Sequence, residues 1–235
     1  MNMNGKIIRL LKSHLVDYIG FADITRYQDD LAWFGGGIVR GYRSAVSIGV
    51  VIPDSIVDHL PDRNDTNVSC EYRTHGYEVL NQRLNLTASF LSSYLNGRNY
   101  RTLPIAVADR TDEENALPTV SHKMIAHISG LGWIGKNCLL ITRTHGPRVR
   151  FISVLTDAPL RTVDDPLPQE CGECEECVKA CPVGAIKGRN YVTGEEREDR
   201  LDFMKCQKYF EGLKKRQTYP VCGMCLHACP YGKRS

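Results

Sequence analysis

The feature that most constrains this chain is a run of four cysteines, Cys171, Cys174, Cys177 and Cys181, followed directly by Pro182. The run reads Cys-x-x-Cys-x-x-Cys-x-x-x-Cys-Pro, a spacing typical of iron–sulfur ligation. Three thiolates on one tight loop can bind three corners of a 4Fe–4S cube. The fourth, after a short helical turn, points toward a second cube. Pro182 ends that turn because proline cannot continue a helix.

A second, incomplete copy of the run lies further along the sequence. It consists of Cys222, Cys225 and Cys229, followed by Pro230, and it lacks the first cysteine. Cys206, sixteen residues before Cys222, can supply that ligand. In two-cluster ferredoxins the fourth ligand of each run binds the other cluster. The predicted ligands of cluster one are therefore Cys171, Cys174, Cys177 and Cys229, and those of cluster two are Cys206, Cys222, Cys225 and Cys181.

Zinc and disulfide bonds are the alternative uses of so many cysteines. Zinc sites combine Cys-x-x-Cys pairs and have no need of a triplet followed by Cys-Pro. Disulfides suit a small secreted chain, and the sequence carries no signal for secretion. Two 4Fe–4S clusters remain the favoured interpretation of the pattern.

The size of the chain allows one large domain, or one medium and one small domain. We expect an α/β cofactor-binding domain at residues 1–160 and a ferredoxin-like double-cluster domain at residues 161–235 of the 235 residues. Hydrophobic residues make up 42% of the chain, and no apolar run approaches the roughly 20 residues of a membrane span. These features predict a cytoplasmic protein that does not contact a membrane.

The net charge of +3 is too small to indicate nucleic-acid binding by itself. One local exception is residues 205–216, which hold five lysines and arginines and a single acidic residue, Glu211. This stretch could contact phosphate or dock a partner protein, and a solvated helix face is the simpler alternative.

Hydrophobic periodicity predicts an α+β fold with a central sheet, because helical and strand patterns interleave before residue 160. Residues 20–43 and 54–70 read as irregular, and residues 158–169 read as a linker. The predicted helices are 6–19, 70–95 and 121–129, and the predicted strands are 44–53, 103–109, 138–142 and 149–156, the last two paired around a turn at 144–147.

Residues 130–137 read Gly-Leu-Gly-Trp-Ile-Gly-Lys-Asn, and residues 155–160 read Leu-Thr-Asp-Ala-Pro-Leu. Together with the cysteine layout and the first core strand at Tyr42–Ser47, these segments resemble epoxyqueuosine reductases. The resemblance spans residues 40–231. That family shares its catalytic core with reductive dehalogenases.

The resemblance implies a nitroreductase-like α/β sheet that binds cobalamin, and two clusters that reduce the corrinoid to the cob(I)alamin level. It also implies a low-potential electron donor of the ferredoxin or flavodoxin type. The substrate is then a small molecule or a modified nucleoside, with tRNA as a further option. The residues expected to contact the cofactor are Arg43, Gly132, Trp133, Gly135, Lys136 and Asn137.

Two departures from the family pattern leave the substrate open. Epoxyqueuosine reductases carry an Asp-x-x-Pro motif whose aspartate is the proposed proton donor, whereas Asn115 stands at that position here, before Pro118. An amide cannot act as a general acid. The sequence also resembles a short form, without the helical-repeat region that follows the clusters in longer members.

Two further interpretations of the whole chain remain. The first is a two-cluster electron-transfer protein that reduces or reactivates a partner. The second places a flavin instead of cobalamin on the sheet. Cys70 and Cys138 fall outside both ligand sets, and Tyr72 and Tyr77 are candidate proton donors.

Overall fold

The structure is a computed structural model that describes residues 2–29, 36–107, 118–163 and 165–233. The chain divides into two compact units, each built from three segments. The first, here called the sheet unit, comprises Met1–Val50, Asn81–Leu131 and Arg150–Leu167. The second, the cluster unit, comprises Val51–Leu80, Gly132–Val149 and Pro168–Ser235. The boundary expected at residue 160 stays a prediction.

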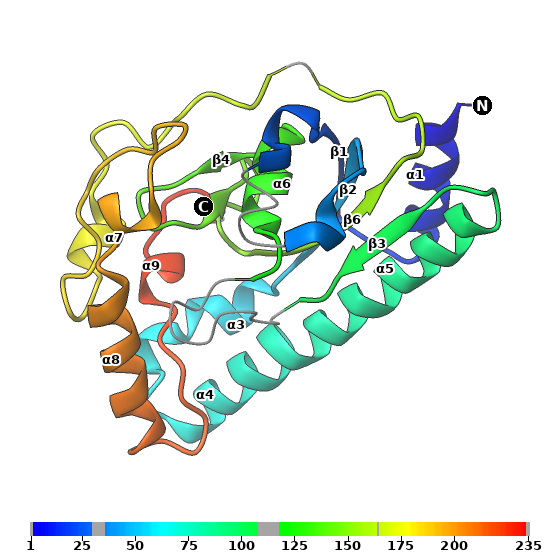
Figure 1. The fold of residues 1–235 in the computed structure, drawn as a ribbon. Coiled ribbons are helices and arrows are strands. Elements are labelled where there is room, and N and C mark those ends of the chain that lie inside the picture. The colour runs from blue at the N-terminus through cyan, green and yellow to red at the C-terminus, as the bar shows by residue number, and fades with distance from the viewer. Residues whose placement is uncertain (1, 30–35, 108–117, 164, 234–235) are drawn as a thin grey trace. The chain divides into compact units, whose positions relative to one another are not determined.

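The sheet unit is built on four strands in the order β1-β2-β6-β3, drawn in Figure 1. Strand β1 is antiparallel to β2, and β3 is antiparallel to β6. Nearly every residue of β2 and β6 is buried, which suits their continuous β-branched sequences and central places in the sheet. The strands are β1 Tyr18–Asp23, β2 Ser44–Val51, β3 Thr102–Ile105 and β6 Val149–Thr156.

The described part of the sheet unit also contains the helices α1 Met3–Ser13, α5 Leu80–Asn96 and α6 His122–Ile128. Helix α5 packs on the end of α1, where the rings of His14 and Phe90 stack with centroids 4.8 Å apart. Arg83 of α5 donates to the carbonyl of His14 at 3.3 Å and so satisfies an orphan helix-end acceptor. The structure confirms the helix predicted at 121–129.

The cluster unit is held together by a buried arginine that joins two of its three segments. Arg148, 1% exposed, forms ion pairs with Asp54 at 2.9 Å and Asp58 at 2.7 Å. Its carbonyl accepts from the amide of Ile52 at 2.8 Å. Because Arg148 is buried while Asp54 and Asp58 are 23% and 55% exposed, the two carboxylates bring counter-charge to it from the solvent side. The elements of this unit are α3 Asp54–Asp58, α4 Thr66–Arg73, β4 Trp133–Ile134, β5 Leu140–Ile141, α7 Glu176–Lys179, α8 Phe203–Lys214 and α9 Met224–His227.

The long helix predicted at 70–95 is present but is not uniform. Helix α4 runs through a π-helical segment, Thr74–Val79, into α5. A π-turn inserts an extra residue and rotates the helix face that follows it. After this segment, Leu84, Leu91 and Leu95 of α5 are buried, whereas Leu86 and Phe90 are 59% and 47% exposed.

Other elements differ from the sequence prediction. Strand β1 begins within the predicted helix 6–19 and continues into a stretch predicted to be irregular, α3 lies in the predicted irregular stretch 54–70, and α4 begins there and runs into the predicted helix 70–95. The pairing expected between residues 138–142 and 149–156 is wrong, because β5 pairs with β4 instead. The register shows Trp133 opposite Ile141.

No helix among the described residues is long and apolar enough to span a bilayer.

His122 makes the stability of the sheet unit sensitive to acid. Its ring lies 3.1 Å from Ser153 Oγ and 3.3 Å from the carbonyl of Ala106. Burial chiefly lowers its pKa to about 4, the Ala106 carbonyl opposes this, and the charge of Arg150 adds to it. The unfolded chain takes up this proton near pH 6.5, so stability is present above that pH and is lost as the pH falls.

We expect acidification from pH 7 to pH 5 to cost about 2 kcal/mol through His122. The measurement is the thermal midpoint of the wild-type chain and of His122→Gln at both pH values. The variant loses less on acidification than the wild type. Equal losses in the two proteins contradict the assignment.

Candidate iron–sulfur site

The structure brings the eight predicted ligand thiols together in the cluster unit. Cys171 and Cys174 lie on a loop with Gly172 at a φ of 49°, and Cys177 lies in α7. The second run repeats this arrangement: Cys222 precedes a left-handed Gly223, and α9 follows. The remaining thiols are Cys181 after α7, Cys206 in α8, Cys225 in α9 and Cys229 after α9.

The mutual electrostatics of the thiols divides them into two groups. Burial chiefly raises the pKa of Cys177 to about 11, and the charges of Cys171 and Cys174 add to it. Burial likewise raises the pKa of Cys229 to about 12, and Cys171, Cys177 and Cys174 add to it. These four thiols therefore face one another.

The second group forms in the same way. Burial first, and then the charges of Cys222 and Cys181, raise the pKa of Cys206. Burial also raises the pKa of Cys225, with Cys222, Cys206, Cys177 and Cys181 adding to it. These proximities are compatible with the sets predicted for clusters one and two, although Cys177 of the first set also acts on Cys225 of the second. Ligation itself stays a prediction.

The donor set fits two 4Fe–4S clusters. Each group offers four thiols, and protonated thiols of raised pKa must release their protons to bind a metal. Among the described residues, no three Cys, His, Asp or Glu side chains are arranged to hold a single metal ion. A cube keeps its thiolates further apart than one tetrahedral ion does, because each thiolate binds a different corner.

Trp133 packs directly against predicted cluster one. It is 1% exposed and lies in an apolar cluster with Ile141 and Cys229. Its Nε1–H donates to Cys171 Sγ at 3.4 Å, and Tyr231 meets it edge-on with centroids 4.8 Å apart. Hydrogen bonds to cluster sulfurs help to set reduction potential. The indole N–H thus donates a hydrogen bond to the sulfur of a predicted cluster ligand.

Lys136 and Asn137 are also buried, at 5% and 6% exposed. The charge of Lys136 opposes the upward shift in the pKa of Cys177. Asn137 donates to the carbonyl of Cys225 at 3.0 Å and accepts from the amide of Leu139 at 3.1 Å. Both side chains are directed at the cysteine segments, and their contact with a corrinoid stays a prediction.

The glycines of this segment are required by tight packing on β5. A Cβ on Gly132 would lie 2.2 Å from the carbonyl oxygen of Ile141, and one on Gly135 would lie 2.7 Å from Asn137 Oδ1. Both distances are shorter than any real Cβ contact. Arg43, the remaining predicted cofactor residue, is exposed in the sheet unit, and Asn115 lies outside the described residues.

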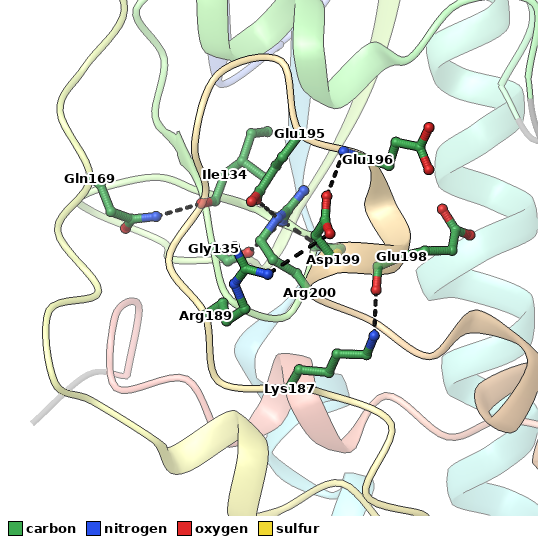
Figure 2. A network of polar contacts seen from close by, with 11 residues as sticks. Ile134, Gly135, Gln169, Lys187, Arg189, Glu195, Glu196, Glu198, Asp199 and Arg200 are labelled. Atoms are coloured by element: carbon green, nitrogen blue, oxygen red, sulfur yellow. Dashed lines mark hydrogen bonds and ion pairs between the residues drawn. The ribbon is translucent and has the colours of Figure 1, made fainter.

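A buried ion pair supports the turn after β4. Arg200 and Glu195 are 6% and 8% exposed in their side chains and contact each other. Arg200 Nη1 also donates to the carbonyl of Gly135 at 3.1 Å and to Cys138 Sγ at 3.3 Å. Figure 2 shows Arg200 at the centre of this network. The pair therefore fixes the backbone between Trp133 and the cluster segments.

Gln169 and Arg63 are further site residues that the sequence prediction missed. Gln169 donates to the carbonyl of Ile134 at 2.8 Å, as Figure 2 shows, and accepts from the amide of Cys171 at 2.8 Å. Arg63 donates to Met224 Sδ at 3.1 Å. Burial raises the pKa of Cys222, and the backbone of Met224 and the charge of Arg63 oppose this rise. Neither residue stands in a recognisable motif, so no sequence signal indicated it.

Removing the Trp133 N–H is expected to make the potential of cluster one more negative. A donor to sulfur stabilises the more negative, reduced state, so Trp133→Phe lowers the potential by some tens of mV, given about 59 mV per tenfold change for one electron. An EPR-monitored redox titration measures it. Tyr231→Phe is the control, because it keeps the packing ring and the indole N–H. An unshifted potential in Trp133→Phe is the contrary result.

Comparison with known proteins agrees with this site. Residues 170–232 match a family model described as a 4Fe-4S double cluster binding domain. The epoxyqueuosine reductase of Listeria monocytogenes is 37% identical over 123 residues, covering 48% of this chain and 30% of that protein. The one of Salmonella typhimurium is 33% identical over 160 residues, covering 61% of this chain and 39% of that protein. The matched segments therefore span less than half of these relatives.

Solved structures share the fold across nearly the whole chain. An epoxyqueuosine reductase solved with an epoxyqueuosine-modified tRNA stem loop superposes with a TM-score of 0.65 at 20% identity, covering 98% of this chain and 65% of that one. A reductive dehalogenase described for B12-dependent dehalogenation gives 0.68 at 19% identity, covering 94% and 30%. The chain thus carries a 4Fe–4S double cluster binding domain at residues 170–232 on a mixed α/β fold, and it is similar to epoxyqueuosine reductases in sequence and in fold.

Proposed function

We propose that this chain is a cobalamin-dependent oxidoreductase of the cytoplasm whose two 4Fe–4S clusters deliver electrons to a corrinoid on a nitroreductase-like sheet. The observation that carries the proposal is the meeting of two motifs in the cluster unit. The indole of Trp133, from the segment that resembles the family, donates to Cys171, a predicted cluster ligand. A segment expected at the cofactor is thereby in direct contact with a segment expected at a cluster.

The chain's own residues have definite tasks in such an enzyme. Trp133 and Lys136 exclude water from predicted cluster one, since both are buried beside its thiols. Arg200 and Glu195 hold the turn that carries them. Cobalamin, when bound, supplies the low-potential cobalt chemistry that reduces the substrate. Buried, hydrogen-bonded clusters reach the potentials that this chemistry needs.

The substrate class in this proposal is a small molecule or a modified nucleoside, the latter by analogy with relatives named for epoxyqueuosine. Asn115 provides no acid, so the proton comes from another group. An anaerobic titration of the reconstituted protein with cob(II)alamin tests the proposal by EPR. A base-off Co(II) signal supports it, and spectra identical to those of free cobalamin, with both clusters intact, overturn it.

A two-cluster electron-transfer protein is the second candidate function. Asn115 favours it, because an amide in place of the family's aspartate removes the proposed proton donor. This candidate predicts reducible clusters, no corrinoid signal and no turnover of its own, so the same titration separates the two candidates.

A further inference from the structure

Helix α8 presents one predicted cluster ligand at the surface, among cations. Cys206 is exposed, and Lys205 and Lys208 on either side of it are exposed as well. Burial raises the pKa of Cys206, and the charges of Cys222 and Cys181, its predicted partners in cluster two, raise it further. The surface of α8 is therefore where cluster two comes closest to solvent through one of its own ligands.

A groove of about 330 Å³ runs along this part of the cluster unit. Its walls include Lys205, Lys208 and Arg216 from α8 and the turn after it, residues spaced so that they share one side of the helix. Val183, two residues after Cys181, closes the other side. The groove is thus lined by Lys205, the residue next to Cys206 in the sequence, and by a residue of the segment that follows Cys181. The lining residues are Val183, Lys205, Lys208, Tyr209, Gly212 and Arg216.

The charge of this surface is positive. Residues 202–216 hold five lysines and arginines against two carboxylates, Asp202 and Glu211. Asp202 pairs with Lys205 at 3.5 Å, and Glu211 accepts from the amide of Gln207 at 3.3 Å. An excess of one charge on a surface raises the encounter rate with an oppositely charged partner.

We propose that this groove docks an acidic electron-transfer protein, which passes one electron at a time to cluster two. The donor's cofactor is oxidised by one electron and the cluster is reduced by one. The inference rests on the clusters of the proposed function and adds the point at which electrons enter. An RNA backbone would also favour cations, but only an electron donor gains from their position around an exposed cluster ligand.

The test is the rate at which reduced flavodoxin, an acidic donor, bleaches the clusters in a stopped-flow experiment. We expect Lys208→Glu/Arg216→Glu to lower the second-order rate constant about tenfold at low ionic strength. We also expect added salt to slow the wild-type reaction and to leave the variant almost unaffected. Both positions are exposed, so the substitutions leave the core intact.

A matched control carries the same change in net charge elsewhere. Lys6→Glu/Lys12→Glu alters two exposed lysines of α1, in the sheet unit, and is expected to react with flavodoxin at nearly the wild-type rate. Dithionite reduction of every variant shows that the clusters are intact. An unchanged rate in Lys208→Glu/Arg216→Glu, or an equal loss in the control, overturns the proposal.

A short RNA stem-loop distinguishes the other polyanion. If Lys208→Glu/Arg216→Glu weakens RNA binding in fluorescence anisotropy while the flavodoxin rate is unchanged, the groove is an RNA site and the proposal is wrong. The rate of cluster reduction is measured without cobalamin. Failure of the docking proposal is thus separate from failure of the cobalamin titration.

Discussion

Replacing Glu195 by alanine is expected to destabilise the cluster unit by about 3–5 kcal/mol, because it leaves the guanidinium of Arg200 buried without its counter-charge. Arg200 also contacts the Gly135 carbonyl, Cys138 Sγ and the ring of Tyr191, whose centroid lies 4.9 Å from its Cζ. None of these groups carries a negative charge, so they replace the carboxylate only in part. The cost therefore exceeds that of an ordinary lost hydrogen bond of about 1 kcal/mol.

The measurement is the thermal midpoint of cluster absorbance in the holoprotein at fixed protein concentration. A loss of this size lowers the midpoint by roughly 10 °C in a chain of this length. The double variant Glu195→Leu/Arg200→Met recovers part of the loss, because apolar replacement of a buried pair is often close to neutral.

An exposed pair in the same loop is the matched control. Arg197 and Glu198 form an ion pair in which Glu198 is 56% exposed. Surface pairs contribute about 0–1 kcal/mol, so Glu198→Ala is expected to shift the midpoint by only a few degrees. Equal shifts in Glu195→Ala and Glu198→Ala would show that the burial of the first pair is energetically irrelevant.

Local patterns in the sequence were sufficient for some elements of the fold. Strand β2 follows from a continuous β-branched run, and α6 follows from apolar spacing between Ser121 and Gly130. Ser121 caps that helix by accepting from the amide of Met124, and Gly130 leaves it at a φ of 73°. Such signals act within a few residues, so they survive in any tertiary context.

Elements fixed by distant contacts were missed. Strand β1 is interrupted by Gly20, a weak strand former, and it is stabilised by pairing with β2. The partner of β5 is β4, which precedes it by a turn that Arg200 holds from 65 residues away. Strand β2 and Arg200 both lie outside the short sequence windows that contain β1 and β5. Hydrophobic periodicity therefore missed β1 and predicted a wrong partner for β5.

The candidate site divides in the same way. The spacing of the cysteines is local, so the ligand sets can be predicted from the sequence alone. The direction of Trp133 depends on the packing around it, and its contact with Cys171 had no local signal. The stretch 195–200 reads as a solvated, charged loop, yet it contains the buried pair of Glu195 and Arg200. Burial of a charge is set by the whole unit.

The exchange of fourth ligands is expected to appear as a non-additive loss of iron. In the wild-type chain two 4Fe–4S clusters hold about eight iron atoms. Cys181→Ala removes a ligand of cluster two and reduces the content to about four. Adding Cys206→Ala removes a second ligand from the same cluster, so Cys181→Ala/Cys206→Ala also retains about four. The two thiols act on each other in the structure.

The complementary variant is Cys206→Ala/Cys229→Ala. Cys229 faces Cys171, Cys177 and Cys174, so this variant damages both clusters and is expected to retain almost no iron. Without the exchange the two results are reversed: Cys181→Ala/Cys206→Ala loses both clusters, and Cys206→Ala/Cys229→Ala keeps one. Iron and sulfide analysis therefore decides between the two ligation schemes from one pair of proteins.

Cys70→Ala is the control, since Cys70 lies outside both groups and its Sγ is 3.9 Å from Thr74 Oγ1. It is expected to retain all of the iron.

The exchange of fourth ligands also has a physical consequence for the arrangement of the two clusters. Cys177 lies in α7 and Cys181 follows that helix directly, and Cys177 also acts on Cys225 of the other set. If the clusters bind as predicted, this shared backbone would hold them at a fixed separation.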